Sequence, residues 1–588
     1  MPVMKLAFFI LLQATVGLAM DSRNLEWRQL LHMEKTLTGE RSKIRNPKFF
    51  LNPEGSTNPE AELQTTYQKM FEAPQAERKE TQCRYLARRD FFLRHHPELK
   101  SKVLACEVSD EWLKRLGATK VSLIFAAGYM NSAASSFGHT FLKLQNPQNE
   151  GGKELLDYGI NFAARTQDTQ GALYALYGLF GYFPGSFAML PYHQMIKDYT
   201  HLEGRDLWEY ELNFTPEEVQ RMLFHLLELE GSYTDYYFLD DNCSFMILKI
   251  LEIGRPGLRL AKDDEFFVIP LDTVKEVRQL VTKITYRPSL ETEWRQRRDQ
   301  LNSDQKKKII DLKTDSDLRS LDDQSLSAAQ YRVTLKELEN HEQWKDLGYK
   351  LSLERAKRGS NSHEFHVQQP AQSPDQGHDS SAIEVGFLDQ KDSGYLLIGF
   401  HSAFHDQLSR NTGVPPFSHL EVLGLQWQSS GQQTFLRRYR VLETLSTQAV
   451  TTFEKPLSWG VSAGADTWMD DQLSHEISGR AGYSFDLLPE RMRWTNLVVA
   501  GTRQDESRNF QFAPGFDSRL WFLWTPEIRS FFQYEWTHFP SNDWNQWKAF
   551  QVFDVTSQLE LRLGWESRQD LSSTQIQTSL SLVQNFLF

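Results

Sequence analysis

The pattern of apolar and polar residues is most regular in the last third of the chain, where it repeats at every second position. In the segment 559–566 one parity is apolar and the other is charged apart from Gly564. A period of two predicts β-strands with one apolar face and one polar face. About twelve such segments, each roughly ten residues long, follow Ser381, and the chain ends at Phe588.

These segments carry aromatic residues near their ends and charged residues, such as Glu560 and Arg562, on the second face. A soluble β-sandwich also alternates, but its inner face is apolar and its turns need no aromatic residues. Polar second faces, terminal aromatics and a final aromatic residue are together typical of outer-membrane barrels. We therefore predict an antiparallel β-barrel of about twelve strands over residues 376–588.

The centre of the chain combines short apolar runs with helical patterns. The runs 121–130 and 139–144 have the length of buried strands. Thr215, followed by a proline and two glutamates, has the signature of a helix N-terminus, and a second helix is expected from Asn242 to Gly254. These elements predict an α+β domain over residues 116–290.

The flanking regions read as helical. Residues 20–115 are mostly helical and polar, and residues 291–375 predict a charged helical connector that ends in a low-complexity linker. Residues 1–19 combine one lysine, an apolar run and small residues, which predicts a secretory signal peptide cut after Ala19. The alternative, a membrane anchor, is disfavoured because the run is shorter than the roughly 20 apolar residues of a span.

Charge and cysteine content narrow the partners and the compartment. The 588 residues carry 65 basic and 77 acidic side chains, a formal charge of −12, which gives no electrostatic footprint for nucleic acid. Export places the three cysteines where disulfides persist. Cys83 and Cys106 lie in one N-terminal segment and are expected to pair, which leaves Cys243 free. The alternative is three reduced, buried cysteines.

The free thiol is the sharpest chemical clue. Cys243 falls in the first turn of a predicted helix, where unpaired N–H groups and the helix dipole favour the thiolate. His139 starts a predicted strand directly after Gly138 and is the best-placed general base. The alternative is a buried structural cysteine and a packed histidine. No HExxH or CxxC pattern suggests a metal site, and no cofactor is expected.

Five long blocks resemble one known family, the Lnb N-terminal periplasmic domain. They span roughly Cys83 to Pro256 and read NSAASSFGHTFLKL, DYGINFAA, GLFGYFPGSFAMLPYH, RDLWEYELNFTPEE and DYYFLDDNCSFMILKILEIGRP. The resemblance implies a permuted papain-like (NlpC-type) fold, with His139 and Cys243 at the positions of the catalytic pair. It also implies transfer of a fatty acyl chain from a phospholipid to the amine of a lipoprotein. The barrel departs from this pattern, which leaves the substrate open.

A third polar residue should orient the imidazole. Asn161, on the next predicted strand, is the choice, with Ser136 and Tyr158 in reserve. The glycine-broken aromatic stretch 174–192 is expected either to line an acyl groove or to pack in the core.

Three functions remain open from the sequence. The first is a thiol acyltransferase that works through a Cys243 thioester, with a phospholipid donor and a lipoprotein acceptor. The second is a cysteine amidase or peptidase that acts on the cell wall. The third is a non-enzymatic barrel with a periplasmic scaffold domain. All three place the protein in the outer membrane with its N-terminal domain in the periplasm.

Overall fold

The computed structural model describes most of the chain between residues 21 and 587. The described ranges are 21–36, 39–128, 138–166, 169, 173, 177–178, 180–238, 241–261, 268–312, 315–359, 365–390, 393–410, 412–467, 472–505, 507–540, 543–571 and 573–587. The expected signal peptide (1–19), Ser136 and the terminal Phe588 lie outside them. Within these ranges, the model contains no helix of sufficient length and hydrophobicity to cross a membrane.

The first compact unit contains residues up to Arg115 together with 220–235 and 249–259. Its elements are α1 (Leu25–Leu30), β1 (Met33–Thr36), β2 (Gly39–Ser42), α2 (Pro59–Phe71), α3 (Gln75–Arg84), α4 (Leu86–His95) and α5 (Glu107–Leu116). A disulfide joins Cys83 to Cys106, as predicted, and Cys243 is free. The mostly helical character expected here is therefore observed, with one added hairpin.

A buried ion pair lies at the centre of this first unit. Arg88 is fully buried, and its guanidinium contacts the carboxylates of Glu62 and Glu228, which are also fully buried. The Arg88 backbone N–H donates to Glu228 Oε1 at 2.8 Å, and the guanidinium donates to the carbonyl oxygen of Phe49 at 2.9 Å. Arg88, Glu62 and Glu228 therefore each have an oppositely charged partner, as charges buried away from water require.

The second unit opens with a seven-stranded sheet in the order β8-β6-β5-β4-β3-β7-β9. Its elements are β3 (Lys120–Ala126), β4 (His139–Gln145), β5 (Tyr158–Ala164), β6 (Phe183–Pro191), α7 (Tyr192–Ile196), β7 (Leu207–Leu212), α8 (Pro216–Glu228), β8 (Thr234–Tyr236), α9 (Cys243–Gly254), α10 (Pro270–Glu276) and β9 (Val281–Arg287). The predicted strands and both predicted helices appear at the expected places. Most of α8 and the second half of α9 belong to the first compact unit.

Residues of β3, β4, β7 and α7 form a small apolar core. Ile124, Phe141, Tyr192, Met195 and Leu207 are buried together there. Successive residues of a strand face opposite sides of a sheet, so His139 and Phe141, two positions apart, lie on the same face of β4. The core therefore holds the strand that begins with the candidate base.

The charged segment after β9 forms five helices with a core of their own. They are α11 (Leu290–Asp299), α12 (Ser303–Ile310), α13 (Asp315–Arg319), α14 (Asp323–Glu339) and α15 (His341–Arg358). Trp294, Leu326 and Leu351 are among the buried residues of this core. The helical connector predicted from composition thus packs as a small bundle.

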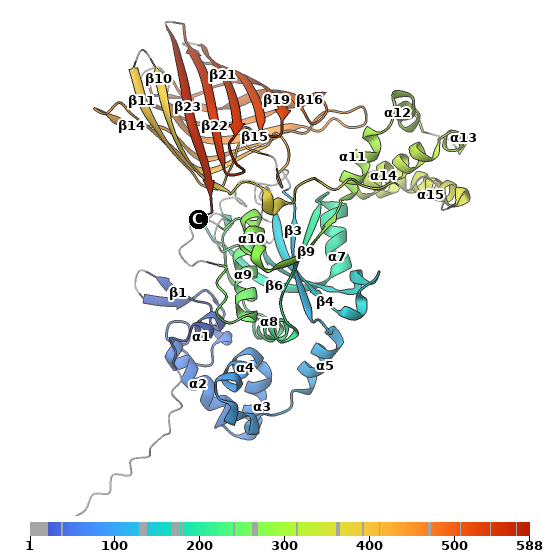
Figure 1. Ribbon diagram of the computed structural model, residues 1–588, viewed down its shortest axis with the longest axis vertical. Coiled ribbons are helices and arrows are strands. Elements are labelled where there is room, and N and C mark those ends of the chain that lie inside the picture. Colours follow the sequence, from blue (N-terminus) through green and yellow to red (C-terminus); the bar gives the residue numbers. More distant parts are fainter. Residues whose placement is uncertain are drawn as a thin grey trace, which may run out of the picture. The chain divides into compact units, whose positions relative to one another are not determined.

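The C-terminal region is a closed antiparallel barrel of twelve long strands within the described residues. They are β10 (Ser381–Gln390), β11 (Ser393–His401), β13 (His419–Ser429), β14 (Thr434–Ser446), β15 (Ser458–Thr467), β16 (Leu473–Leu488), β17 (Met492–Gln504), β19 (Gly515–Thr525), β20 (Ile528–His538), β21 (Asp543–Asp554), β22 (Leu559–Gln569) and β23 (Thr574–Phe586). Neighbours in sequence pair throughout, and β23 closes on β10 (Figure 1). The short strands β12 (Phe404–His405) and β18 (Phe510–Phe512) join its rim.

The alternation of the barrel strands is the one predicted from the sequence. Leu563 and Trp565 are exposed on the outer surface, whereas Glu560 and Arg562 are buried inside. On the last strand, Ile576 is 54% exposed and its neighbour Gln577 only 3%. An apolar exterior around a charged interior is the arrangement of a barrel that spans a lipid bilayer.

Candidate functional site

The backbone before His139 requires glycine. Gly138 has φ +90°, and a Cβ atom built on it would lie 2.9 Å from the carbonyl oxygen of Ala126 and 2.5 Å from the ring of Phe125. A side chain is therefore excluded both by conformation and by space. The close approach expected from the Gly-His pair lets β4 begin against β3 with His139 at its first position.

The position of Cys243 is set by the cap of α9. The Asn242 side-chain oxygen accepts from the backbone N–H groups of Ser244 at 2.9 Å and Phe245 at 3.3 Å. Its amide nitrogen donates to Val268 and so anchors the turn from outside the helix. An asparagine cap satisfies first-turn N–H groups and fixes where the helix begins. Cys243 is consequently held as the first residue of α9, 3% exposed.

The structure brings Cys243 and His139 together. The thiol and the imidazole interact electrostatically, and the Cys243 sulfur lies 3.9 Å from the Ser244 hydroxyl and close to the Thr140 backbone N–H. Burial raises the pKa of Cys243, but the charge of His139 and hydrogen bonds to the sulfur outweigh it and bring the pKa down to about 6. A thiolate is thus favoured at neutral pH.

Asn161 completes the row from the neighbouring strand β5. Its side-chain oxygen lies 2.8 Å from His139 Nε2. Because an amide oxygen only accepts, Nε2 carries a proton and Nδ1 is the nitrogen left for the thiol. Burial lowers the pKa of His139, but Cys243 and Asn161 act against it and the net pKa is raised, with Arg205 opposing. Both pKa shifts favour an imidazolium paired with a thiolate.

The reserve residues do not join this row. Tyr158 is 38% exposed at the start of β5, three positions before Asn161, and Ser136 lies outside the described residues. Of the aromatic stretch 174–192, Phe183 and Tyr192 are buried in the core, whereas Phe180 and Tyr182 are 65% and 70% exposed. Core packing therefore accounts for two of these side chains.

A cavity of about 290 Å³ borders Asn161. Its lining combines apolar and acidic side chains: Leu190, Met195, Leu202, Tyr199, Asp198 and Glu203. Four of them come from η6 (Lys197–Leu202), a π-helical turn that follows α7, and from the residue after it. Sequence reasoning missed this segment because its residues carry no periodic or motif signal.

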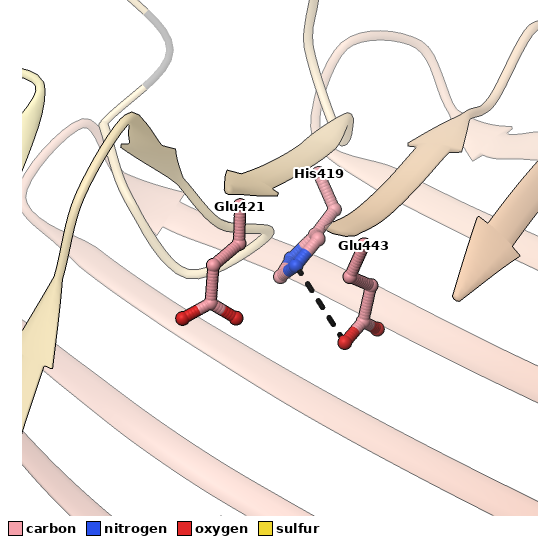
Figure 2. Close-up of side chains that lie close together, drawn as sticks. All are labelled: His419, Glu421 and Glu443. Carbon is pink, nitrogen blue, oxygen red and sulfur yellow. Dashed lines mark ion pairs between the residues drawn. The ribbon is translucent and has the colours of Figure 1, made fainter. Parts of the chain in front are cut away.

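The barrel interior holds a second cluster of titratable groups. His419 and Glu421 lie on β13, and Glu443 lies on β14 directly opposite Glu421, with His419 Nε2 3.9 Å from a Glu443 oxygen (Figure 2). Their atoms are close enough to hold a metal ion. However, one Arg438 nitrogen lies 2.9 Å from Glu421 and 3.0 Å from Glu443. This guanidinium already pairs with both carboxylates, so an ion would have to displace it.

Three parts of the chain match family models. Residues 109–279 match the family model of the Lnb N-terminal periplasmic domain. Residues 371–584 and 22–95 match two models, each described as a domain of unknown function (DUF7840 and DUF7843). No curated protein matches the chain.

Two solved porins are similar to this chain. The NanC porin has a TM-score of 0.24 and 6% identity, over 35% of this chain and 100% of that chain. The KdgM porin in complex with disordered oligogalacturonate has a TM-score of 0.23 and 6% identity, over 35% of this chain and 99% of that chain. The Lnb periplasmic match and the closed barrel with an apolar exterior identify an outer-membrane protein with a periplasmic N-terminal domain.

Proposed function

We propose that this protein is an envelope thiol acyltransferase that moves a fatty acyl chain from a phospholipid to an amine, the N-terminus of a lipoprotein. The observation that carries the proposal is the arrangement of the buried Cys243 with the half-buried His139 and Asn161 within the Lnb-like region. A nucleophile, a base and a residue that orients the base are the parts that thiol acyl transfer needs.

The first half of the reaction forms a thioester. The Cys243 thiolate attacks the carbonyl carbon of the lipid ester, and the tetrahedral intermediate collapses with loss of the lipid alkoxide. The His139 imidazolium gives its Nδ1 proton to that oxygen, so a lysophospholipid alcohol leaves. The positive end of the α9 dipole lies beside the sulfur and stabilises negative charge there.

The second half consumes the thioester. An unprotonated amine attacks the thioester carbonyl, neutral His139 takes a proton from the attacking nitrogen, and the thiolate leaves. The products are an amide and the starting thiolate–imidazolium pair. Asn161 holds Nε2 in both halves, so Nδ1 always faces the sulfur.

The cavity beside Asn161 supports an amine acceptor over water. Asp198 places a carboxylate on this lining beside the apolar Leu190, Met195 and Leu202, and Glu203 adds a second carboxylate that is paired with Arg205 at 2.8 Å. Carboxylates attract a protonated amine, and the apolar side chains suit a lipid-bearing partner. A peptidoglycan hydrolase has no need of such a lining, because its substrate is polar.

The test is acyl transfer by the detergent-solubilised full chain. Phospholipid is the donor, and the acceptor is a synthetic diacylated lipopeptide with a free N-terminal amine. The wild type should form the N-acyl product, Cys243→Ser should form none, and His139→Ala should lose at least about a hundredfold. His193→Ala, an exposed histidine of α7, is the matched control and should retain full activity.

Two outcomes would contradict the proposal. If Cys243→Ser transfers acyl chains at the wild-type rate, the thiol takes no part. If the wild type instead cleaves purified peptidoglycan in a Cys243-dependent manner and leaves the lipopeptide unchanged, the amidase reading replaces it.

A further inference from the structure

The ring of Tyr199 packs on the candidate base. The centroids of His139 and Tyr199 are 5.6 Å apart with 21° between the planes, and Tyr199 stacks equally on Phe141 at 5.2 Å and 13°. His139 and Phe141 alternate along β4, so one tyrosine covers two successive rings of the same strand face. Asn161 holds one edge of the imidazole, and Tyr199 covers its plane.

The segment that carries Tyr199 is anchored on both sides. The Thr200 hydroxyl donates to the carbonyl oxygen of Ile196 at 2.7 Å, and Thr200 is 2% exposed. The Arg205 backbone N–H donates to the Tyr199 carbonyl oxygen at 2.9 Å. A π-helical turn is rare and frequently lies at a functional site. Here the turn η6 directs Tyr199 onto His139.

The charges around this stack favour a ring over an aliphatic side chain. The groups that face the imidazole are Cys243 from α9 and Arg205 from the loop after η6. Arg205 also lies 5.8 Å from the centre of the Tyr199 ring, and Asp198 and Glu203 act on its hydroxyl. The face of an aromatic ring attracts cations, so it stabilises an imidazolium more than a neutral imidazole.

We propose that Tyr199 is a positioning residue for the Cys243–His139 pair, whose ring fixes the imidazole plane and stabilises its charged form. This inference depends on the proposed function only in naming the reaction that Cys243 and His139 perform. The ring acts on the ionisation of the pair, which is measurable without any substrate. Burial and the Glu203 carboxylate raise the pKa of Tyr199, so its hydroxyl stays protonated and takes no proton from the pair.

The experiment is the pH dependence of Cys243 alkylation by iodoacetamide, followed by mass spectrometry of the intact full chain. Cys83 and Cys106 are joined in a disulfide and do not react. Tyr199→Met keeps the apolar volume and removes the ring, so the apparent pKa of the thiol should rise by about one unit. Labelling should therefore fall about tenfold below that pKa and recover in alkali. Tyr199→Phe keeps the ring and should retain the wild-type profile.

The matched control is Tyr286→Met. Tyr286 packs on Trp208 in the same sheet, with the ring centroids 4.9 Å apart and the planes 49° apart, so its replacement also removes a packed tyrosine ring but does not touch Cys243 or His139. The inference is wrong if Tyr199→Met keeps the wild-type pH profile. It is also wrong if the labelling rate of Tyr199→Met falls equally at every pH, because that result would indicate a general loss of packing around Cys243. If Tyr199→Met does not fold, a profile shift in Tyr199→Phe equally overturns it.

This result is separable from acyl transfer. A shifted alkylation profile in Tyr199→Met with full transfer activity in Cys243→Ser would sustain the positioning role and reject the proposed function. An unshifted alkylation profile in Tyr199→Met together with an inactive Cys243→Ser would reject the positioning role and sustain the proposed function.

Discussion

The hydrogen bond that His139 donates to Asn161 gives the most direct test of how the site works. Asn161→Ala removes the 2.8 Å partner of Nε2 and leaves the sulfur, the imidazole and the cap of α9 in place. A hydrogen bond to a charged group contributes about 1.5–3 kcal/mol. If that bond is fully formed only when the imidazole is charged, kcat for acyl transfer should fall about 10- to 150-fold. KM should change little, because Asn161 does not hold the substrate.

The pH dependence follows from the sign of the pKa shifts. Asn161 raises the pKa of His139, and the charged imidazole lowers the pKa of Cys243 to about 6. Loss of Asn161 therefore lowers the pKa of His139 and raises the pKa of Cys243, so the thiolate–imidazolium pair is less populated at low pH. The acid limb of the rate profile should move to higher pH, and the deficit should shrink as the pH rises.

The assay is kcat and KM for transfer from phospholipid to the lipopeptide over the pH range in which the chain stays folded. Asn161→Asp restores an acceptor oxygen and should recover part of the lost rate. Asn149→Ala, which removes an asparagine that bonds Asp157 away from the pair, is the matched control and should behave as the wild type. The reasoning fails if Asn161→Ala keeps wild-type kcat, or if it raises KM alone.

Two further predictions concern the scaffold. Gly138→Ala should destabilise the periplasmic domain by about 2–4 kcal/mol in thermal unfolding, because it adds a side chain at a positive φ and a contact under 3 Å. Alkylation of Cys243 should also fall. Unchanged stability would show that the turn relaxes freely. Arg88→Met should cost about 3–5 kcal/mol in denaturant unfolding, because the buried carboxylates of Glu62 and Glu228 would lose the guanidinium that they share. Glu62→Gln in the same background should recover part of that loss, and no recovery would count against an electrostatic cause.

The sequence by itself determined the elements whose signals are local. The period of two after Ser381 determined which side of each barrel strand faces the bilayer. A one-residue shift in strand register would place the charged side chains in the lipid. Thr215 with its proline and glutamates fixed the start of α8, and Gly138 before His139 marked a backbone that no side chain fits. The chemical types of the site were also legible, since only Cys243 was left after the other two cysteines paired.

Only the tertiary structure decided which of these residues meet. His225 looked like an ordinary helical residue, yet it is fully buried with Nε2 2.9 Å from His32 Nε2 in the first unit. Cys243 and His139 come from a helix and a strand far apart in sequence, and no pattern along the chain encodes their separation in space. Tyr199 has no signal at all, because its position depends on a π-helical turn and on the two rings of β4 beneath it. Local patterns fix how each segment folds, whereas contacts between segments depend on packing that the whole chain determines together.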